Sequence, residues 1–114
     1  MKKAVTLKQN RDFRRLYAKG RSAVSSPLVI YCRRNRLGHN RLGITVSTKL
    51  GGAVRRNRIR RRLREVHRLN RDFLAPGYDL ILVARGRAFD APFPKLTEAF
   101  RRCCRELAIW REEP

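Results

Sequence analysis

The sequence predicts a single small α+β domain over residues 1–114, a two-layer sandwich whose elements follow in the order α-β-β-β-α-β-α. Three observations predict this class. A chain of 114 residues with 42% hydrophobic content has the length of one domain and can bury one modest core. Stretches with helical periodicity alternate with β-branched and aromatic stretches, which favours helices packed on one layer of mixed sheet. No internal repeat or linker interrupts the pattern.

Residues 6–20 predict the first helix. Thr6 and Gln9 fit a capping box, and Asn10 is an alternative cap. Gly20 is a natural C-terminal stop. At helical spacing, one face of this segment carries Phe13, Leu16 and Tyr17.

Residues 22–34 alternate as a strand does, with Leu28, Ile30 and Cys32 on one face and Val29, Tyr31 and Arg33 on the other. Pro27 favours an edge position or a bulge in this segment. Residues 35–40 contain Gly38 and suit a turn. Residues 41–47 read as a further strand, and we expect it to pair with the first as an antiparallel hairpin.

The segment from Ala53 onward predicts an amphipathic helix after a glycine-bearing loop at 48–52. On a helical wheel its apolar stripe comprises Ile59, Leu63, Val66, Leu69 and Phe73. Arg62 sits at the edge of that stripe, and we expect its stem to extend outward to water.

Residues 75–86 predict a turn followed by a near-continuous apolar strand, the pattern of a strand buried on both faces at the centre of a sheet. Pro92 and Pro94 then precede a last helix. Its apolar positions are Leu96, Phe100, Cys103, Leu107 and Trp110.

The charge of the chain is strongly positive and uneven. With 29 Lys and Arg against 9 Asp and Glu, the formal net charge is +20. Residues 1–64 contain 20 basic residues and one acid, whereas residues 65–114 are nearly balanced. Such self-repulsion opposes compaction unless a polyanion neutralises it, so a nucleic acid is the expected partner and the first half of the chain the expected binding region.

Seven arginines occupy the ten positions from Arg55 to Arg64, with Asn57 among them. Guanidinium groups donate in a planar fork that matches phosphate oxygens, and a helical row of them spans successive phosphates. The alternative without a function is a charged face that is only solvated, but such faces usually carry both positive and negative side chains. A DNA-reading helix is the other alternative, although no helix-turn-helix pair of suitable spacing precedes it.

The remaining chemistry of the sequence points away from several classes. Cys32, Cys103 and Cys104 form no paired metal-ligand spacing, and we expect reduced thiols, with Cys32 and Cys103 in the core. No apolar run reaches membrane-spanning length and the N-terminus lacks the block of a secretion signal, so we expect a cytoplasmic protein without a membrane partner.

Two histidines are the obvious candidates for acid-base catalysis. His39 lies in the predicted turn and His67 on the arginine helix, where we expect a solvated side chain and a helix-face side chain near phosphate. Their spacing does not bring them together, and the scattered acids compose no metal cluster. We therefore expect no catalytic residue, no protein-bound metal and no small-molecule substrate.

The segment "RNRIRRRLRE", Arg56 to Glu65, resembles the RNR signature of the bacterial ribonuclease P protein subunit, and the resemblance extends along the chain. Gly52 departs from the asparagine common there, and Tyr17 from the frequent phenylalanine. The matching positions are Asp12-Phe13, Gly20, Tyr31, Gly43, Val46-Ser47, Lys49, Gly51, Ala53-Val54, Arg56-Asn57-Arg58, Arg60-Arg61, Arg64-Glu65 and Ala84-Arg85.

This resemblance implies a ribosomal-protein-like fold with a left-handed βαβ crossover, and two RNA-binding surfaces. The surface for the catalytic RNA subunit comprises Lys49, Arg56, Asn57, Arg58, Arg60, Arg61 and Arg64. The cleft for the single-stranded 5′ leader of precursor tRNA comprises Phe13, Arg14, Tyr17, Tyr31, Arg33 and Arg85. Removal of the leader would be catalysed by Mg²⁺ ions that the RNA subunit and the substrate hold, leaving a 5′ phosphate on the tRNA.

Other functions stay open at this point. A small basic ribosomal protein would co-purify with ribosomal RNA, which is far longer than the catalytic RNA. A protein that is a nuclease by itself would cleave precursor tRNA even when the protein preparation contains no other RNA. A DNA-binding regulator would prefer duplex DNA. Without the resemblance, the aromatic residues of the cleft also fit an ordinary core.

Overall fold

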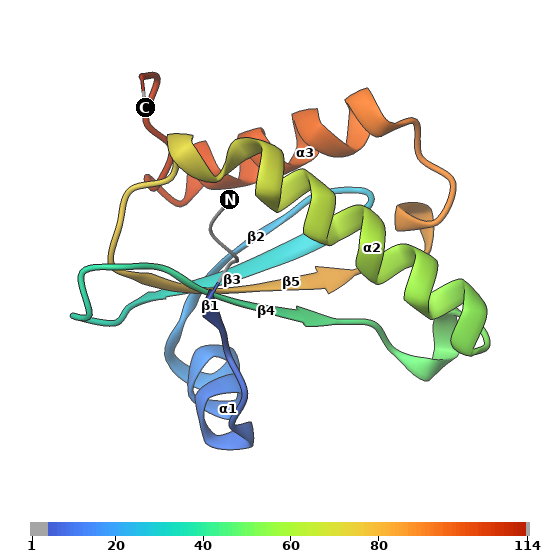
Figure 1. Cartoon of the computed structure of the whole chain (residues 1–114), viewed down its shortest axis with the longest axis horizontal. Coiled ribbons are helices and arrows are strands. Elements are labelled where there is room, and N and C mark those ends of the chain that lie inside the picture. The colour runs from blue at the N-terminus through green and yellow to red at the C-terminus, as the bar shows by residue number, and fades with distance from the viewer. Residues whose placement is uncertain (1–4, 114) are drawn as a thin grey trace.

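The strand β5 (Tyr78–Ala84) forms the centre of a five-stranded sheet in the order β1-β4-β5-β3-β2. Figure 1 shows this sheet in a computed structural model that describes residues 5–113. The Met1–Lys3 start, on which the secretion-signal expectation rests, lies outside the described residues. Leu80, Ile81 and Leu82 are all buried, because β5 carries apolar side chains towards both faces. The predicted α+β class, element order and central strand are confirmed, but helices pack on both faces of the sheet, so the predicted two-layer arrangement is wrong.

The predicted extended segment at 22–34 consists of two antiparallel strands, β2 (Arg21–Val24) and β3 (Leu28–Arg34). Ser25 makes the turn between them, because its hydroxyl and its backbone N–H both donate to the carbonyl of Leu28. Pro27 follows in this turn, where its missing N–H costs no ladder bond. The alternation of β3 is confirmed, with Ile30 fully buried and Tyr31 facing the opposite side of the sheet.

The predicted hairpin between the first strand and residues 41–47 is wrong. β3 and β4 (Arg41–Thr45) do not pair, because β5 lies between them, antiparallel to β3 and parallel to β4. Residues 35–40 cross over the start of β5: the N–H of Asn35 donates to Gly77, and the side chain of Asn40 bonds Ala75 and Tyr78. The more apolar strand thus takes the doubly covered position. Beyond β4, the short β1 (Val5–Thr6), absent from the prediction, pairs parallel to it.

Two helices cover one face of the sheet (Figure 1). The long α2 (Ala53–Asn70) connects β4 to β5, and α3 (Phe93–Glu106) lies beside it. Ile59 and Leu63 of α2 and Phe100 of α3 are fully buried in the main core against Ile30 and Leu82 of the sheet. The hand of the β4-α2-β5 crossover stays a prediction.

The helix α1 (Asn10–Lys19) packs on the opposite face of the sheet, below it in Figure 1. Leu16 of α1, Leu7 and Ile81 form a second, smaller buried cluster. Gly20 ends the helix as predicted, but in an extended conformation with φ −76°. A side chain does not fit there, because a β-carbon would lie 2.5 Å from the carbonyl oxygen of Leu16.

Three helix details differ from the predictions. Thr6 belongs to β1 and Gln9 makes no side-chain cap, so the predicted capping box is absent and α1 begins at Asn10. In α2 the buried stripe continues through His67 and Asn70, whereas Leu69 is 52% exposed. Phe73 lies beyond α2 and stacks on Trp110, which itself lies beyond the end of α3.

All three cysteines, Cys32, Cys103 and Cys104, are free and buried in the main core. Burial raises the pKa of each thiol, which keeps the thiols protonated and unreactive. Between residues 5 and 113, no helix is both long and apolar enough to cross a membrane.

Candidate nucleic-acid interface

The first half of α2 presents a row of guanidinium groups without acidic partners. Within the described part of the chain, none of the seven arginines from Arg55 to Arg64 forms a salt bridge. The only acid of the helix, Glu65, is paired with Arg68 one turn further on. Like charges at helical spacing repel each other, and a polyanion outside the chain would relieve this repulsion.

The loop before α2 is built to hold the start of that helix. Ser47 caps the short 3₁₀ helix at Thr48–Leu50 by accepting from the N–H of Lys49. Gly51 has φ 132°, which favours glycine. The side chains of Arg55 and Arg56 reach back to donate to the carbonyl oxygens of Leu50 and Gly51. The loop and the helix therefore present their charges as one surface.

The predicted surface for the catalytic RNA is contiguous in the structure. Lys49 lies in the capped loop, and the other members lie along α2 between positions 56 and 64. Asn57 accepts a hydrogen bond from the Nη1 of Arg60 at 3.1 Å, which spaces these side chains along the helix. The exposed members of this surface are Lys49, Asn57, Arg58, Arg61 and Arg64, while Arg56 and Arg60 are half-buried.

Arg62 does not extend to water as predicted. Its side chain is half-buried and donates to the backbone carbonyls of Phe89 and Ala91, the first at 2.6 Å. The loop that enters α3 offers these carbonyl oxygens, and a guanidinium at the edge of the buried stripe satisfies them better than water does. Arg62 is therefore a structural arginine within the row of guanidinium groups.

On the opposite face of the sheet, Tyr17 of α1 and Tyr31 of β3 meet edge to face, with ring centroids 5.0 Å apart. The hydroxyl of Tyr17 is 2.8 Å from the Oγ1 of Thr45 on β4, so the pair spans the sheet from β3 to β4. Tyr17 is 39% exposed and Tyr31 is half-buried. The two rings form an aromatic surface that α1 leaves accessible.

The other predicted members of the cleft have different environments. Phe13 is half-buried and packs in the cluster beneath α1, so it supports the cleft more than it lines it. Arg33 follows Tyr31 on the same face of β3, and its Nη1 is buried without a hydrogen-bond partner among residues 5–113. Arg14 is exposed on α1, and Arg85 donates to the carbonyl of Ser25 at 2.9 Å.

Sequence reasoning missed two features of this face. Thr45 aligns Tyr17, and only its register next to Val83 of β5 reveals that it shares the face of Tyr31. Asp79 accepts hydrogen bonds from Arg41 and Asn35 at the far end of the same face. Burial alone raises the pKa of Asp79, but these bonds outweigh it and hold the pKa below its usual range.

The two histidines differ in their exposure to solvent. His39 is exposed in the loop at 35–40, as predicted. The prediction for His67 is wrong, because it is only 5% exposed and lies on the buried side of α2. Burial, with the nearby charge of Arg71, lowers the pKa of His67 to about 4. A neutral histidine inside the fold has no access to a scissile phosphate.

Comparisons with a family model and with known proteins give matches over most of the chain. The family model for Ribonuclease P matches residues 1–108. The chain is 42% identical to the ribonuclease P protein component of Natranaerobius thermophilus over 109 residues, which covers 96% of this chain and 95% of that one.

Solved structures are also similar to this fold. That of the RNase P protein from Staphylococcus aureus matches with a TM-score of 0.83 and 34% identity, covering 96% of this chain and 100% of that chain. The RNase P protein from Thermotoga maritima matches with a TM-score of 0.76 and 30% identity, over 83% of this chain and 90% of that chain.

Proposed function

Because the chain belongs to the ribonuclease P protein family and is thus the protein subunit of an endoribonuclease that processes tRNA, we propose a division of labour between its two faces. The arginine face of α2 binds the catalytic RNA. The aromatic cleft beside α1 binds the 5′ leader of precursor tRNA. The RNA subunit, with its Mg²⁺, hydrolyses the phosphodiester bond.

The single observation that carries the first part is the unpaired arginine row of α2. Arg58, Arg61 and Arg64 are exposed and have no acidic partner within the described residues. Each guanidinium donates two parallel hydrogen bonds to a phosphate, and a folded RNA offers phosphates at the spacing of successive helical turns. The attraction between arginines and phosphates is electrostatic, so the affinity for RNA falls as the salt concentration rises.

The aromatic pair supports the second part. Tyr17 and Tyr31 offer ring surface on which a base of any sequence stacks, as a leader of varying sequence requires. Arg33 lies on the same face of β3 as Tyr31 and is half-buried, and its positive charge favours the phosphates of a bound strand. Because α1, which carries Tyr17, and α2 lie on opposite faces of the sheet (Figure 1), the protein would lie between the two RNAs.

The described residues support hydrolysis by the RNA and not by the protein. His67 is buried and neutral, and His39 lies alone in an exposed loop. Within residues 5–113, no three His, Cys, Asp or Glu side chains gather into a cluster that could hold a metal ion. The proposal therefore assigns Mg²⁺ to the RNA and the substrate, and gives the protein the task of lowering the repulsion between them.

The experiment is a reconstitution in three parts, each with a labelled precursor tRNA at low Mg²⁺. One contains the protein alone after removal of all RNA, the second contains a bacterial ribonuclease P RNA alone, and the third contains both. We expect cleavage in the third, weak cleavage in the second and none in the first. Cleavage by the protein alone, or no stimulation of the RNA, would overturn the proposal.

A further inference from the structure

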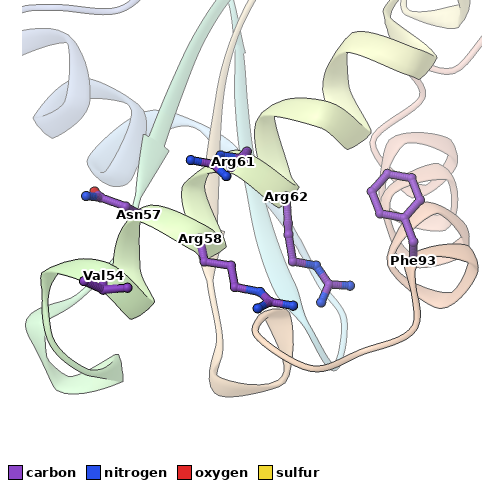
Figure 2. Close-up of a pocket in the computed structure, with 6 residues that line it drawn as sticks. All are labelled: Val54, Asn57, Arg58, Arg61, Arg62 and Phe93. Atoms are coloured by element: carbon purple, nitrogen blue, oxygen red, sulfur yellow. The ribbon is translucent and has the colours of Figure 1, made fainter.

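A hollow lies between the arginine face of α2 and the start of α3. Figure 2 shows its lining, with Arg58 and Arg62 extending from α2 towards the loop that leads into α3. The hollow is open to solvent and has a volume of about 610 Å³. Its lining residues are Val54, Asn57, Arg58, Arg61, Arg62 and Phe93.

One part of this lining is apolar, formed by Val54 and Phe93. Val54 is 87% exposed in the first turn of α2, and the half-buried phenyl ring of Phe93 lies at the opposite end of the hollow (Figure 2). Phe93 packs against the main core on one side and faces the hollow on the other. Phosphates are bound by hydrogen-bond donors and positive charges, so a surface that contacts only phosphates does not need a partly exposed aromatic ring.

The other part of the lining consists of side chains with hydrogen-bond donors. Some of these side chains already bond other parts of the chain, and others make no hydrogen bond. Arg62 is committed to the carbonyls of Phe89 and Ala91. Arg58 lies over the ring of Phe89, 5.3 Å from its centroid, and like Arg61 it makes no hydrogen bond within residues 5–113. The side-chain carbonyl of Asn57 accepts a hydrogen bond from Arg60, and its amide N–H groups have no partner within residues 5–113.

We infer that this hollow is a binding site for a single unpaired nucleotide of the catalytic RNA, which rests on the proposed function of α2. The base packs against Phe93, and the phosphates on either side are held by Arg58 and Arg61. An extruded nucleotide supplies an aromatic face and two flanking phosphates, which is the combination that this lining complements. A continuous RNA helix supplies only the phosphates.

The test separates stacking from charge neutralisation by their salt dependence. The affinity of the chain for a bacterial ribonuclease P RNA is measured from 50 to 200 mM salt for Phe93→Leu, Arg58→Ala and Arg61→Ala. We expect Phe93→Leu to weaken binding about fivefold to a hundredfold at every salt concentration, with an unchanged slope of log affinity against log salt. Arg58→Ala and Arg61→Ala should each reduce that slope by about one.

Phe73→Leu is the matched control, because Phe73 is also half-buried but stacks on Trp110 beyond the other end of α2. It should leave the affinity unchanged, and thermal melting of each variant confirms that the chain is folded. If Phe93→Leu stays folded and binds the RNA as tightly as the unmodified chain, the nucleotide site is wrong. If the unmodified chain does not bind this RNA at all, the proposed function itself fails.

A second measurement does not depend on affinity. A benzophenone amino acid in place of Phe93 is activated by light in the assembled protein–RNA complex. We expect a crosslink to one nucleotide that is unpaired in the RNA. Crosslinks spread over paired nucleotides would overturn the inference, because they would mean that the hollow faces a continuous helix.

Discussion

Phe13 of α1 lies so close to Gly43 of β4 that a β-carbon on Gly43 would come within 2.7 Å of the Cζ of the phenyl ring. Real β-carbons essentially never approach another atom so closely. The ring cannot easily yield, because it packs in the cluster formed by Leu7, Leu16 and Ile81. Gly43 therefore sets the height of α1 above the sheet and, with it, the width of the proposed leader cleft.

Gly43→Ala should displace α1 and lower the free energy of unfolding by about 1 to 3 kcal/mol, the usual cost of overpacking a core. It should also weaken the preference for precursor tRNA over mature tRNA, while binding of the catalytic RNA through α2 changes little. Denaturant unfolding and the two tRNA affinities of the reconstituted complex measure these effects. Gly86→Ala is the control, because a β-carbon at Gly86 meets nothing within 4 Å. Equal behaviour of the two variants would refute this role of Gly43.

Tyr31→Ala should weaken binding of precursor tRNA about fivefold to a hundredfold, since a stacked base is worth about 1 to 3 kcal/mol. Binding of mature tRNA, which has no leader, should not change. Tyr17→Phe keeps the edge-to-face ring and loses only the hydroxyl bond to Thr45, so its effect should be smaller than that of Tyr31→Ala. The measurement is the affinity ratio of the reconstituted complex for the two tRNAs. The cleft assignment is wrong if Tyr31→Ala weakens both tRNAs equally.

Arg61 and Arg62 are neighbours in sequence with opposite expected roles. Arg61→Ala should reduce the salt dependence of RNA binding and leave the melting temperature unchanged, because Arg61 is exposed and makes no bond within the described chain. Arg62→Ala should lower the stability by about 1 to 3 kcal/mol, because two carbonyl groups of the loop lose their donor. Thermal melting and salt titration of both variants check this. A reversed pattern would contradict the assignment of the two arginines.

The stability of the fold should depend on pH through His67. Its pKa is about 4 in the folded chain and near 6.5 in the unfolded chain, so the unfolded chain binds more protons between these values. This contribution is fully present above pH 6.5 and is lost as the pH falls towards 4, amounting to about 3 kcal/mol.

Denaturant unfolding at pH 7.5 and pH 4.5 measures this loss. His67→Phe should lose much less stability than the unmodified chain over the same interval. His39→Gln should behave like the unmodified chain, because His39 is exposed. An equal loss in the His67 variant would show that other groups cause it.

Local patterns in the sequence predicted the elements, but not their pairing. The apolar run of β5 identified the central strand because burial on both faces leaves no room for polar residues. The pairing of β3 with β4 could not be predicted in the same way. A turn at 35–40 fits a hairpin equally well, and only the bonds of Asn35 and Asn40 to the start of β5 show that the segment crosses another strand.

The candidate site was predictable to a similar extent. The arginine row follows from charge and helical spacing, whereas the burial of His67 and Asn70 in place of Leu69 required knowledge of their partners. Asn70 is tolerated in the core because it donates to the carbonyl of Val66 and accepts from Arg101 of α3. A helical wheel that assigns polar residues to water cannot foresee such a partner on another helix. The alignment of Tyr17 with Tyr31 likewise depends on where α1 crosses the sheet.

The most direct test of the account is the affinity of the chain for a bacterial ribonuclease P RNA when Arg60, Arg61 and Arg64 are all replaced by glutamine. Glutamine preserves helix propensity and removes the repulsion between the guanidinium groups, which offsets the loss of the Arg60–Asn57 hydrogen bond, so the melting temperature should not fall. We expect the slope of log affinity against log salt to decrease by roughly two to three, with much weaker binding near physiological salt. If the triple variant binds this RNA with unchanged affinity and slope, α2 is not the surface that binds the catalytic RNA.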